Sequence, residues 1–149
     1  MSLVKQVNED IKTAMRAKDK VTLAAVRGLK KEFLEAQTAK GADSELSDDA
    51  AIKIVQKLVK QRKDSAALYL QQGREDLAEN EQKEAEALMR YLPQQLSSEE
   101  LEAAVKTIIA DLGAESMKDM GRVMGVASKQ LAGKAEGRDI SAKVKALLA

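Results

Sequence analysis

The sequence predicts an all-α protein made of two small helical bundles, with about four helices in the first and three in the second. Aromatic residues are 2% of the 149 residues, and the chain has one proline and eight glycines. β-Sheets favour aromatic and β-branched residues and need frequent turns, so this composition favours helices. Apolar residues, 44% of the chain, recur at intervals of three and four, which is typical of half-buried helices.

The first two predicted helices carry apolar stripes on either side of a capping aspartate. The first stripe consists of Val4, Val7, Ile11, Ala14 and Met15. Asp19 is a good N-cap for the second helix, because its carboxylate can accept a hydrogen bond from the first turn. The second stripe consists of Leu23, Val26, Leu29, Phe33 and Ala36. The polar residues 39–44 then break the pattern.

The third and fourth helices are predicted to form an antiparallel hairpin. Ser47 caps the third helix, and two aspartates follow in its first turn, where the helix dipole favours negative charge. Gly73 is expected to end this helix. The fourth helix runs from about Arg74 to Tyr91. Since a proline disfavours helix at the residue before it, Pro93 marks a boundary between an N-terminal bundle, 1–92, and a C-terminal three-helix bundle, 93–149.

Three shorter helices are predicted after this boundary. Ser97 and Glu100 form a capping box for the fifth helix, which ends before Gly113. The sixth helix opens at Ser116, and its predicted buried stripe consists of Met117, Met120, Met124, Ala127 and Leu131. Residues 133–138 are expected to form a short loop, and Asp139 to cap the last helix.

The composition excludes several kinds of chemistry. The chain has no histidine and no cysteine, so zinc fingers, iron–sulfur sites, cysteine nucleophiles and histidine bases are ruled out. No glycine-rich phosphate loop of the Walker type and no G-x-G-x-x-G motif are present. We therefore predict no catalytic residues, no metal and no cofactor.

The amino terminus lacks the apolar stretch of a secretory signal. No run approaches the roughly 18 apolar residues of a membrane span. We therefore expect a soluble cytoplasmic protein without a membrane partner.

The net charge of +1 conceals a basic C-terminal segment. Residues 117–149 hold seven basic and three acidic residues. A few phosphate contacts from such a segment would give salt-sensitive, sequence-independent RNA binding, although the same residues could be ordinary solvated surface. The RNA-binding candidates are Lys118, Arg122, Lys129, Lys134, Arg138 and Lys143.

A secondary basic ridge is predicted on the third helix. Lys53, Lys57 and Lys60 share one helix face by their spacing of four and three. They could contact phosphates, remain solvated, or pair with the fourth helix, where residues 74–90 hold six acidic and three basic residues.

Two glycines lie four residues apart inside the sixth helix. Gly121 and Gly125 each cost about 1 kcal/mol relative to alanine, so a compensating contact is expected. Another helix packing closely over them is one explanation. Close approach of an RNA backbone or a partner chain is the other.

Several short motifs resemble, in their order and spacing, the YqeY family, which is related to the tail region of GatB. GatB is a subunit of the glutamine-dependent aminoacyl-tRNA amidotransferase. The resemblance covers the full chain. Its motifs are Lys18-Asp19-Lys20 with Leu23 and Arg27, Lys60-Gln61-Arg62-Lys63-Asp64-Ser65, Gly73-Arg74 with Asp76-Leu77, Tyr91-Leu92-Pro93, Met120-Gly121-Arg122-Val123-Met124, and Gly133-Lys134-Ala135-Glu136-Gly137-Arg138 followed by Val144 and Leu147-Leu148.

The resemblance implies two helical bundles and a tail-like region that holds tRNA. It also implies a link to carbon–nitrogen ligases that use glutamine as amido-nitrogen donor, whose glutaminase lies on a different subunit. Because the sequence shows neither a nucleophile nor an ATP site, we expect a non-catalytic tRNA-binding or amidotransferase-associated module. A helical adaptor that docks on a synthetase, an amidotransferase or another enzyme is the alternative.

Overall fold

The computed structural model of the chain describes residues 2–41 and 45–149. Within these ranges the chain forms seven α-helices, one 3-10 turn and no strand, which confirms the all-α prediction. The sequence predicts a break in the helical pattern at residues 39–44. The second helix continues to Lys40, and residues 42–44 lie outside the described residues. The chain divides into two compact units, Met1–Leu92 and Pro93–Ala149.

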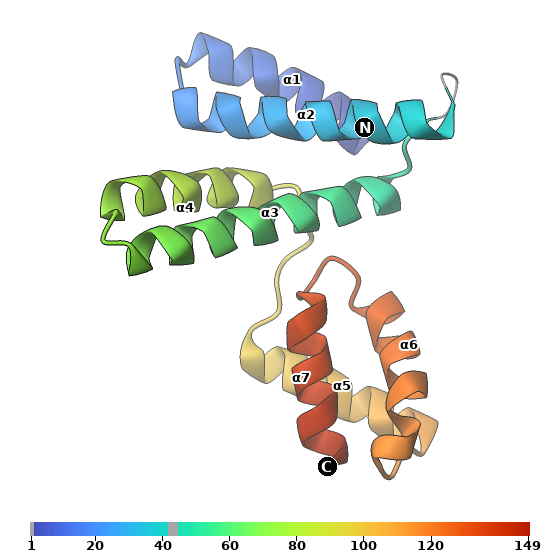
Figure 1. Cartoon of the computed structure of the whole chain (residues 1–149). Helices are drawn as coiled ribbons and strands as arrows, with labels where there is room; N and C mark the ends of the chain where they lie inside the picture. Colours follow the sequence, from blue (N-terminus) through green and yellow to red (C-terminus); the bar gives the residue numbers. More distant parts are fainter. Residues whose placement is uncertain (1, 42–44) are drawn as a thin grey trace. The chain divides into compact units, whose positions relative to one another are not determined.

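The first unit contains four helices (Figure 1). Their bounds are α1 Leu3–Arg16, α2 Lys20–Lys40, α3 Asp48–Gln71 and α4 Glu75–Met89. Two predicted N-caps are confirmed: Asp19 accepts a hydrogen bond from the backbone of Thr22, and Ser47 accepts one from Ala50. Each cap satisfies a donor that the first turn of a helix leaves unpaired.

The core of the first unit is formed by apolar side chains from all four helices. Phe33, Leu29 and Leu88 are among its fully buried members, and each contributes roughly 1.5–3 kcal/mol by leaving water. The shorter helix α4 packs against the C-terminal part of α3 to form a hairpin (Figure 1). The chain turns between these two helices at Gly73, whose φ of 73° suits a residue without a Cβ.

The second unit contains α5 Ser98–Leu112, the 3-10 turn η1 Met117–Asp119, α6 Met120–Gln130 and α7 Gly137–Leu148. The capping box is confirmed: Ser97 and Glu100 exchange two hydrogen bonds of 3.0 and 3.1 Å between backbone N–H and side-chain oxygen. Val105, Val123 and Val144, one from each α-helix, are fully buried in the core.

Two predicted helix starts in the second unit are wrong. Ser116 caps the 3-10 turn rather than α6, and the predicted core residue Met117 is 43% exposed. The tighter winding of a 3-10 turn shifts Met117 off the buried face of the following helix. The last helix begins at Gly137 with Glu136 as N-cap, so Arg138 lies in its first turn and Asp139 is not the cap.

Candidate nucleic-acid interface

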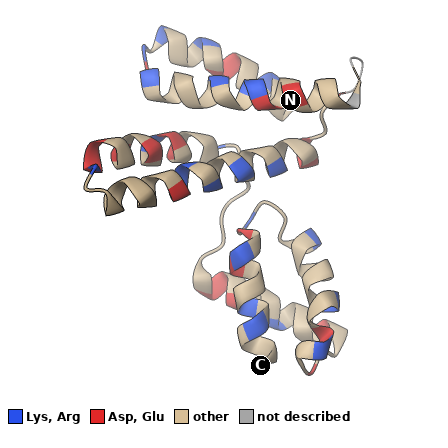
Figure 2. Cartoon of the chain, in the orientation of Figure 1, with Lys and Arg blue, Asp and Glu red and all other residues tan. Residues whose placement is uncertain are grey.

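The predicted RNA-binding residues of the second unit lie on η1, on α6, on α7 and in the loop between these two helices. Side chains of five of them are exposed, namely Lys118, Arg122, Lys129, Lys134 and Arg138, whereas Lys143 is half-buried. Basic residues recur along α6 and α7, and acidic residues gather at the start of α5 (Figure 2). The charge of this unit is therefore segregated by helix.

Lys134 is presented by a loop that is fixed from two sides. Its neighbours Gly133 and Ala135 are buried, and Lys134 is exposed between them. The backbone N–H of Leu96 donates a 2.9 Å hydrogen bond to the carbonyl oxygen of Lys134. Nε2 of Gln95 donates a 2.7 Å hydrogen bond to the carbonyl oxygen of Gly133. The segment that enters the unit thus holds the loop while the ammonium group points to solvent.

Two of the candidate cations are paired with neighbouring carboxylates. Nε of Arg138 lies 2.7 Å from Oε2 of Glu136, and Nη2 of Arg122 lies 3.3 Å from Oδ1 of Asp119. Because exposed pairs of this kind contribute at most about 1 kcal/mol, a phosphate can still attract both guanidinium groups. Lys118, Lys129, Lys134 and Lys143 form no ion pair with the rest of the described chain.

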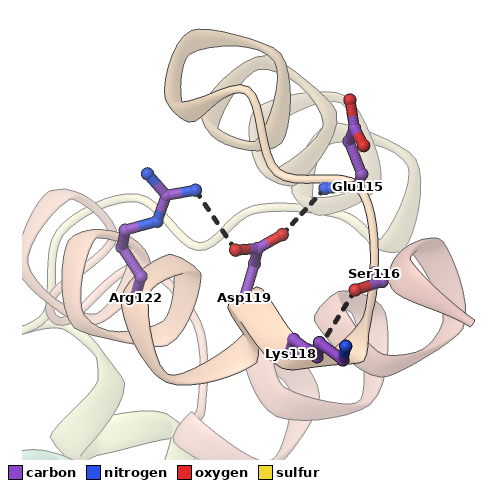
Figure 3. A network of polar contacts seen from close by, with 5 residues as sticks. All are labelled: Glu115, Ser116, Lys118, Asp119 and Arg122. Atoms are coloured by element: carbon purple, nitrogen blue, oxygen red, sulfur yellow. Dashed lines mark hydrogen bonds and ion pairs between the residues drawn. The ribbon is translucent and has the colours of Figure 1, made fainter.

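Asp119 is a positioning residue that the sequence analysis missed. Its carboxylate accepts hydrogen bonds from Arg122 and, at 3.0 Å, from the backbone N–H of Glu115 (Figure 3). The second bond is the main reason that the pKa of Asp119 lies below its usual value. The i, i+3 spacing of Asp119 and Arg122 is the signal that could have predicted this pair.

Gly121 and Gly125 do not pack against another helix. Both are exposed, and the space within 4 Å of the position where a Cβ would lie holds no atom of another part of the described chain. The packing explanation is therefore wrong for the described residues. Instead, the two glycines line an open groove of about 370 Å³ on the outer face of α6, together with Arg122, Val126, Lys129 and Gln130.

The three lysines of the basic ridge, Lys53, Lys57 and Lys60, are exposed. Exposure is what a solvated face or a ligand-contacting face requires. Lys53, Lys57 and Lys60 form no ion pair with α4 or with any other described residue. Arg62 of α3 instead forms ion pairs with α4, because its Nη1 lies 3.3 Å from Glu81 and 4.0 Å from Glu84. Residue spacing alone does not predict that Arg62 rather than the ridge faces the acidic helix.

Two other features are absent from the described residues, namely a cluster of metal-binding side chains and a membrane-spanning helix. Across residues 2–41 and 45–149, no three acidic side chains come close enough to hold a metal ion. Within the same ranges, every helix is too short or too polar to cross a membrane.

Comparison with known proteins identifies relatives over nearly the whole chain. Residues 4–148 match the family model described as Yqey-like protein. Similar curated proteins are each named "Altered inheritance of mitochondria protein 41, mitochondrial". The protein from Kluyveromyces lactis is 31% identical, and the match covers 94% of this chain and 72% of the relative. The protein from Lachancea thermotolerans is 36% identical, with 73% of this chain and 59% of the relative covered. The protein from Pyrenophora tritici-repentis is 30% identical, with 87% of this chain and 71% of the relative covered. The chain thus spans about three fifths to three quarters of these relatives.

The names of these relatives contradict the prediction of a cytoplasmic location. That prediction rested on the lack of a secretory signal and of an apolar run long enough to span a membrane. Neither feature separates the cytoplasm from the interior of a mitochondrion, because targeting to mitochondria uses amphipathic rather than apolar segments.

Proposed function

The chain belongs to the YqeY-like family, and from this premise we propose that its second unit, Pro93–Ala149, is a non-catalytic tRNA-binding module. The observation that carries the proposal is the set of exposed cations on η1, α6 and the loop before α7. Lys118, Lys129 and Lys134 form no ion pair elsewhere in the described chain, so their charges are available to phosphates. Each phosphate contact releases condensed counterions, which makes the affinity fall with salt.

The module would bind the RNA backbone rather than the bases. Residues 93–149 contain no Phe, Tyr or Trp, whereas single-stranded bases are usually held by stacking on aromatic side chains. Lysine and arginine contacts to phosphates position a nucleic acid without reading its sequence. We therefore expect affinity for the tRNA body, with little discrimination between tRNA sequences.

The test is fluorescence anisotropy of labelled total tRNA and of a DNA duplex, titrated with the full chain at two salt concentrations. The double variant Lys134→Glu/Arg138→Glu should weaken tRNA binding and lower the salt slope by about one unit for each lost phosphate contact. A matched control, Lys30→Glu/Lys31→Glu, makes the same charge change at two exposed positions of α2. Equal binding by both double variants would contradict the proposal.

The adaptor function is the second candidate, and exposed leucines of the first unit favour it. Leu68 and Leu70, near the end of α3, are 54% and 50% exposed. A protein partner that covered these side chains would remove their apolar surface from water, which favours association. A stoichiometric partner recovered after nuclease treatment, and lost with Leu68→Ser/Leu70→Ser, would support this function over RNA binding.

A further inference from the structure

We propose that the groove on the outer face of α6 is a docking site for a nucleic-acid backbone. This inference rests on the proposed RNA-binding function and deepens it, because it names a surface on which the strand lies. The groove has a volume of about 370 Å³. Its lining includes two glycines, Gly121 and Gly125, and two cations, Arg122 and Lys129.

Gly125 lies inside α6, where a glycine lowers helix stability, and Gly121 lies in the first turn of the same helix; neither packs against another helix among the described residues. A glycine inside a helix is less favourable than alanine by about 1 kcal/mol. Gly121 and Gly125 lie on the side of α6 opposite the buried residues Val123 and Ala127. What they provide is a helix surface without side chains, which lets a ligand approach the helix closely.

The charge of the groove fits a polyanion. Arg122 and Lys129 are seven residues apart on one face, which separates them by about 10 Å along the helix axis. Phosphates of one strand of a DNA duplex recur about every 3.4 Å along the axis, so a separation of this size lets the two cations contact different phosphates of one strand. The groove-lining residues include no Asp or Glu, and the nearby Asp119 carboxylate is paired with Arg122.

One cation of the groove, Arg122, is oriented before any ligand binds. The Asp119 carboxylate is held by the Glu115 backbone and in turn holds the guanidinium of Arg122 (Figure 3). The apolar surface of Val126 and of the two glycines suits the sugar of a nucleotide. Backbone contact of this kind agrees with the lack of aromatic residues in this unit.

Filling the groove without changing its charge tests the inference. In the full chain, Gly125→Gln adds an uncharged side chain with good helix propensity, into space that holds no other described atom within 4 Å of the new Cβ. We expect the variant to bind labelled total tRNA about tenfold more weakly, equivalent to about 1.4 kcal/mol. The salt slope should stay unchanged, because every cation is retained.

A glycine of the first unit provides the matched control. Gly28 lies inside α2, and a Cβ there also meets open space. Gly28→Ala and Gly125→Ala should each raise the thermal stability of their own unit, but only the second should weaken tRNA binding. This comparison separates a binding effect from a general change in stability.

The outcomes distinguish the groove from the proposed function. If Lys134→Glu/Arg138→Glu weakens binding but Gly125→Gln does not, the groove inference is wrong and the RNA-binding function stands. An occupant such as a protein helix would give that result. If the unaltered chain fails to bind tRNA at low salt, both are wrong.

Discussion

The phenol oxygen of Tyr91 donates a 2.5 Å hydrogen bond to Oδ2 of Asp10, a residue 81 positions earlier in the chain. This bond joins the second residue after α4 to α1, the helix that opens the first unit. Tyr91 is buried in the core of that unit, while Asp10 is half-buried. The contact therefore fixes the two ends of the bundle to each other.

Tyr91→Phe is expected to destabilise the first unit by about 1–2 kcal/mol, the usual effect of removing a partner from a half-buried charged acceptor. Tyrosine fluorescence during urea unfolding measures this, because Tyr69 and Tyr91, the two tyrosines of the chain, lie in the first unit. Tyr69→Phe is the control, since the Tyr69 hydroxyl has no hydrogen bond among the described residues. An equal loss in both variants would contradict the role of the Asp10 bond.

The same bond predicts a loss of stability at high pH. Burial, and then the neighbouring Asp10 carboxylate, raise the pKa of Tyr91 above its ordinary value of 10.0. A raised pKa means that the folded state holds the proton more tightly, so the stabilisation is complete below about pH 10 and falls as pH rises further. In Tyr91→Phe, urea midpoints followed through Tyr69 fluorescence should decline less steeply above this pH.

Arg62→Met is expected to destabilise the first unit by about 2 kcal/mol at pH 7, because it leaves the carboxylate of Glu84 buried without its cation. Glu84 is 8% exposed, and burial raises its pKa while Arg62 opposes the shift. Without Arg62 the pKa rises further. The difference in unfolding free energy between Arg62→Met and the unaltered chain should therefore shrink as pH falls toward about 4, because the Glu84 carboxyl group then binds its proton and loses its charge.

The double variant Arg62→Met/Glu84→Gln is the control for this prediction. Replacing the buried carboxylate by an amide removes most of the desolvation penalty, so the double variant should recover most of the lost stability at pH 7. Urea denaturation at pH 7 and at pH 4 measures both effects. A deficit that is the same at both pH values would show that Arg62 acts through packing alone.

Ser97→Ala is expected to lower the stability of the second unit by about 1 kcal/mol, the usual effect of losing an N-cap. The substitution removes the bond from Glu100 N–H to Ser97 Oγ and weakens its reciprocal partner. Far-UV circular dichroism during heating measures the loss, and tyrosine fluorescence should not change, since the unit contains no tyrosine. Ser98→Ala, one position later, should leave the melting temperature nearly unaltered.

The helices and most of their caps could be predicted because their causes are local. Asp19, Ser47 and Ser97 each stand before an apolar stripe, and a short oxygen-bearing side chain at that position has few alternatives to capping. The start of α7 had no such local cause. Glu136 becomes its N-cap because the loop before it is fixed by the burial of Gly133 and Ala135, which depends on the whole unit.

The environment of the candidate site could be predicted only in part. The helical period alone places Gly121 and Gly125 opposite Val123 and Ala127, so the open face of α6 was available from the sequence. That neither α5 nor α7 covers this face depends on how these two helices pack, which residue spacing does not reveal. Likewise, Arg62 rather than Lys53 faces Glu84 because of the register between α3 and α4.

Gln95→Ala is expected to loosen the loop that presents Lys134. Nε2 of Gln95 donates hydrogen bonds to the carbonyl oxygens of Pro93, at 2.9 Å, and of Gly133, at 2.7 Å. Losing both leaves a buried carbonyl without its partner, which should lower the stability of the second unit by about 1–2 kcal/mol. Hydrogen exchange should show faster exchange of the Leu96 amide, which donates to the Lys134 carbonyl.

The effect of Gln95→Ala on tRNA binding should be small and should leave the salt slope unchanged, because Lys134 keeps its charge and loses only its fixed position. Gln94→Ala, at an exposed neighbouring position, is the matched control and should change neither the exchange rate nor the affinity. If Gln95→Ala leaves the Leu96 amide as protected as before, the backbone bond to Lys134 holds the loop without the glutamine. The side chain of Gln95 would then be dispensable for presenting this cation.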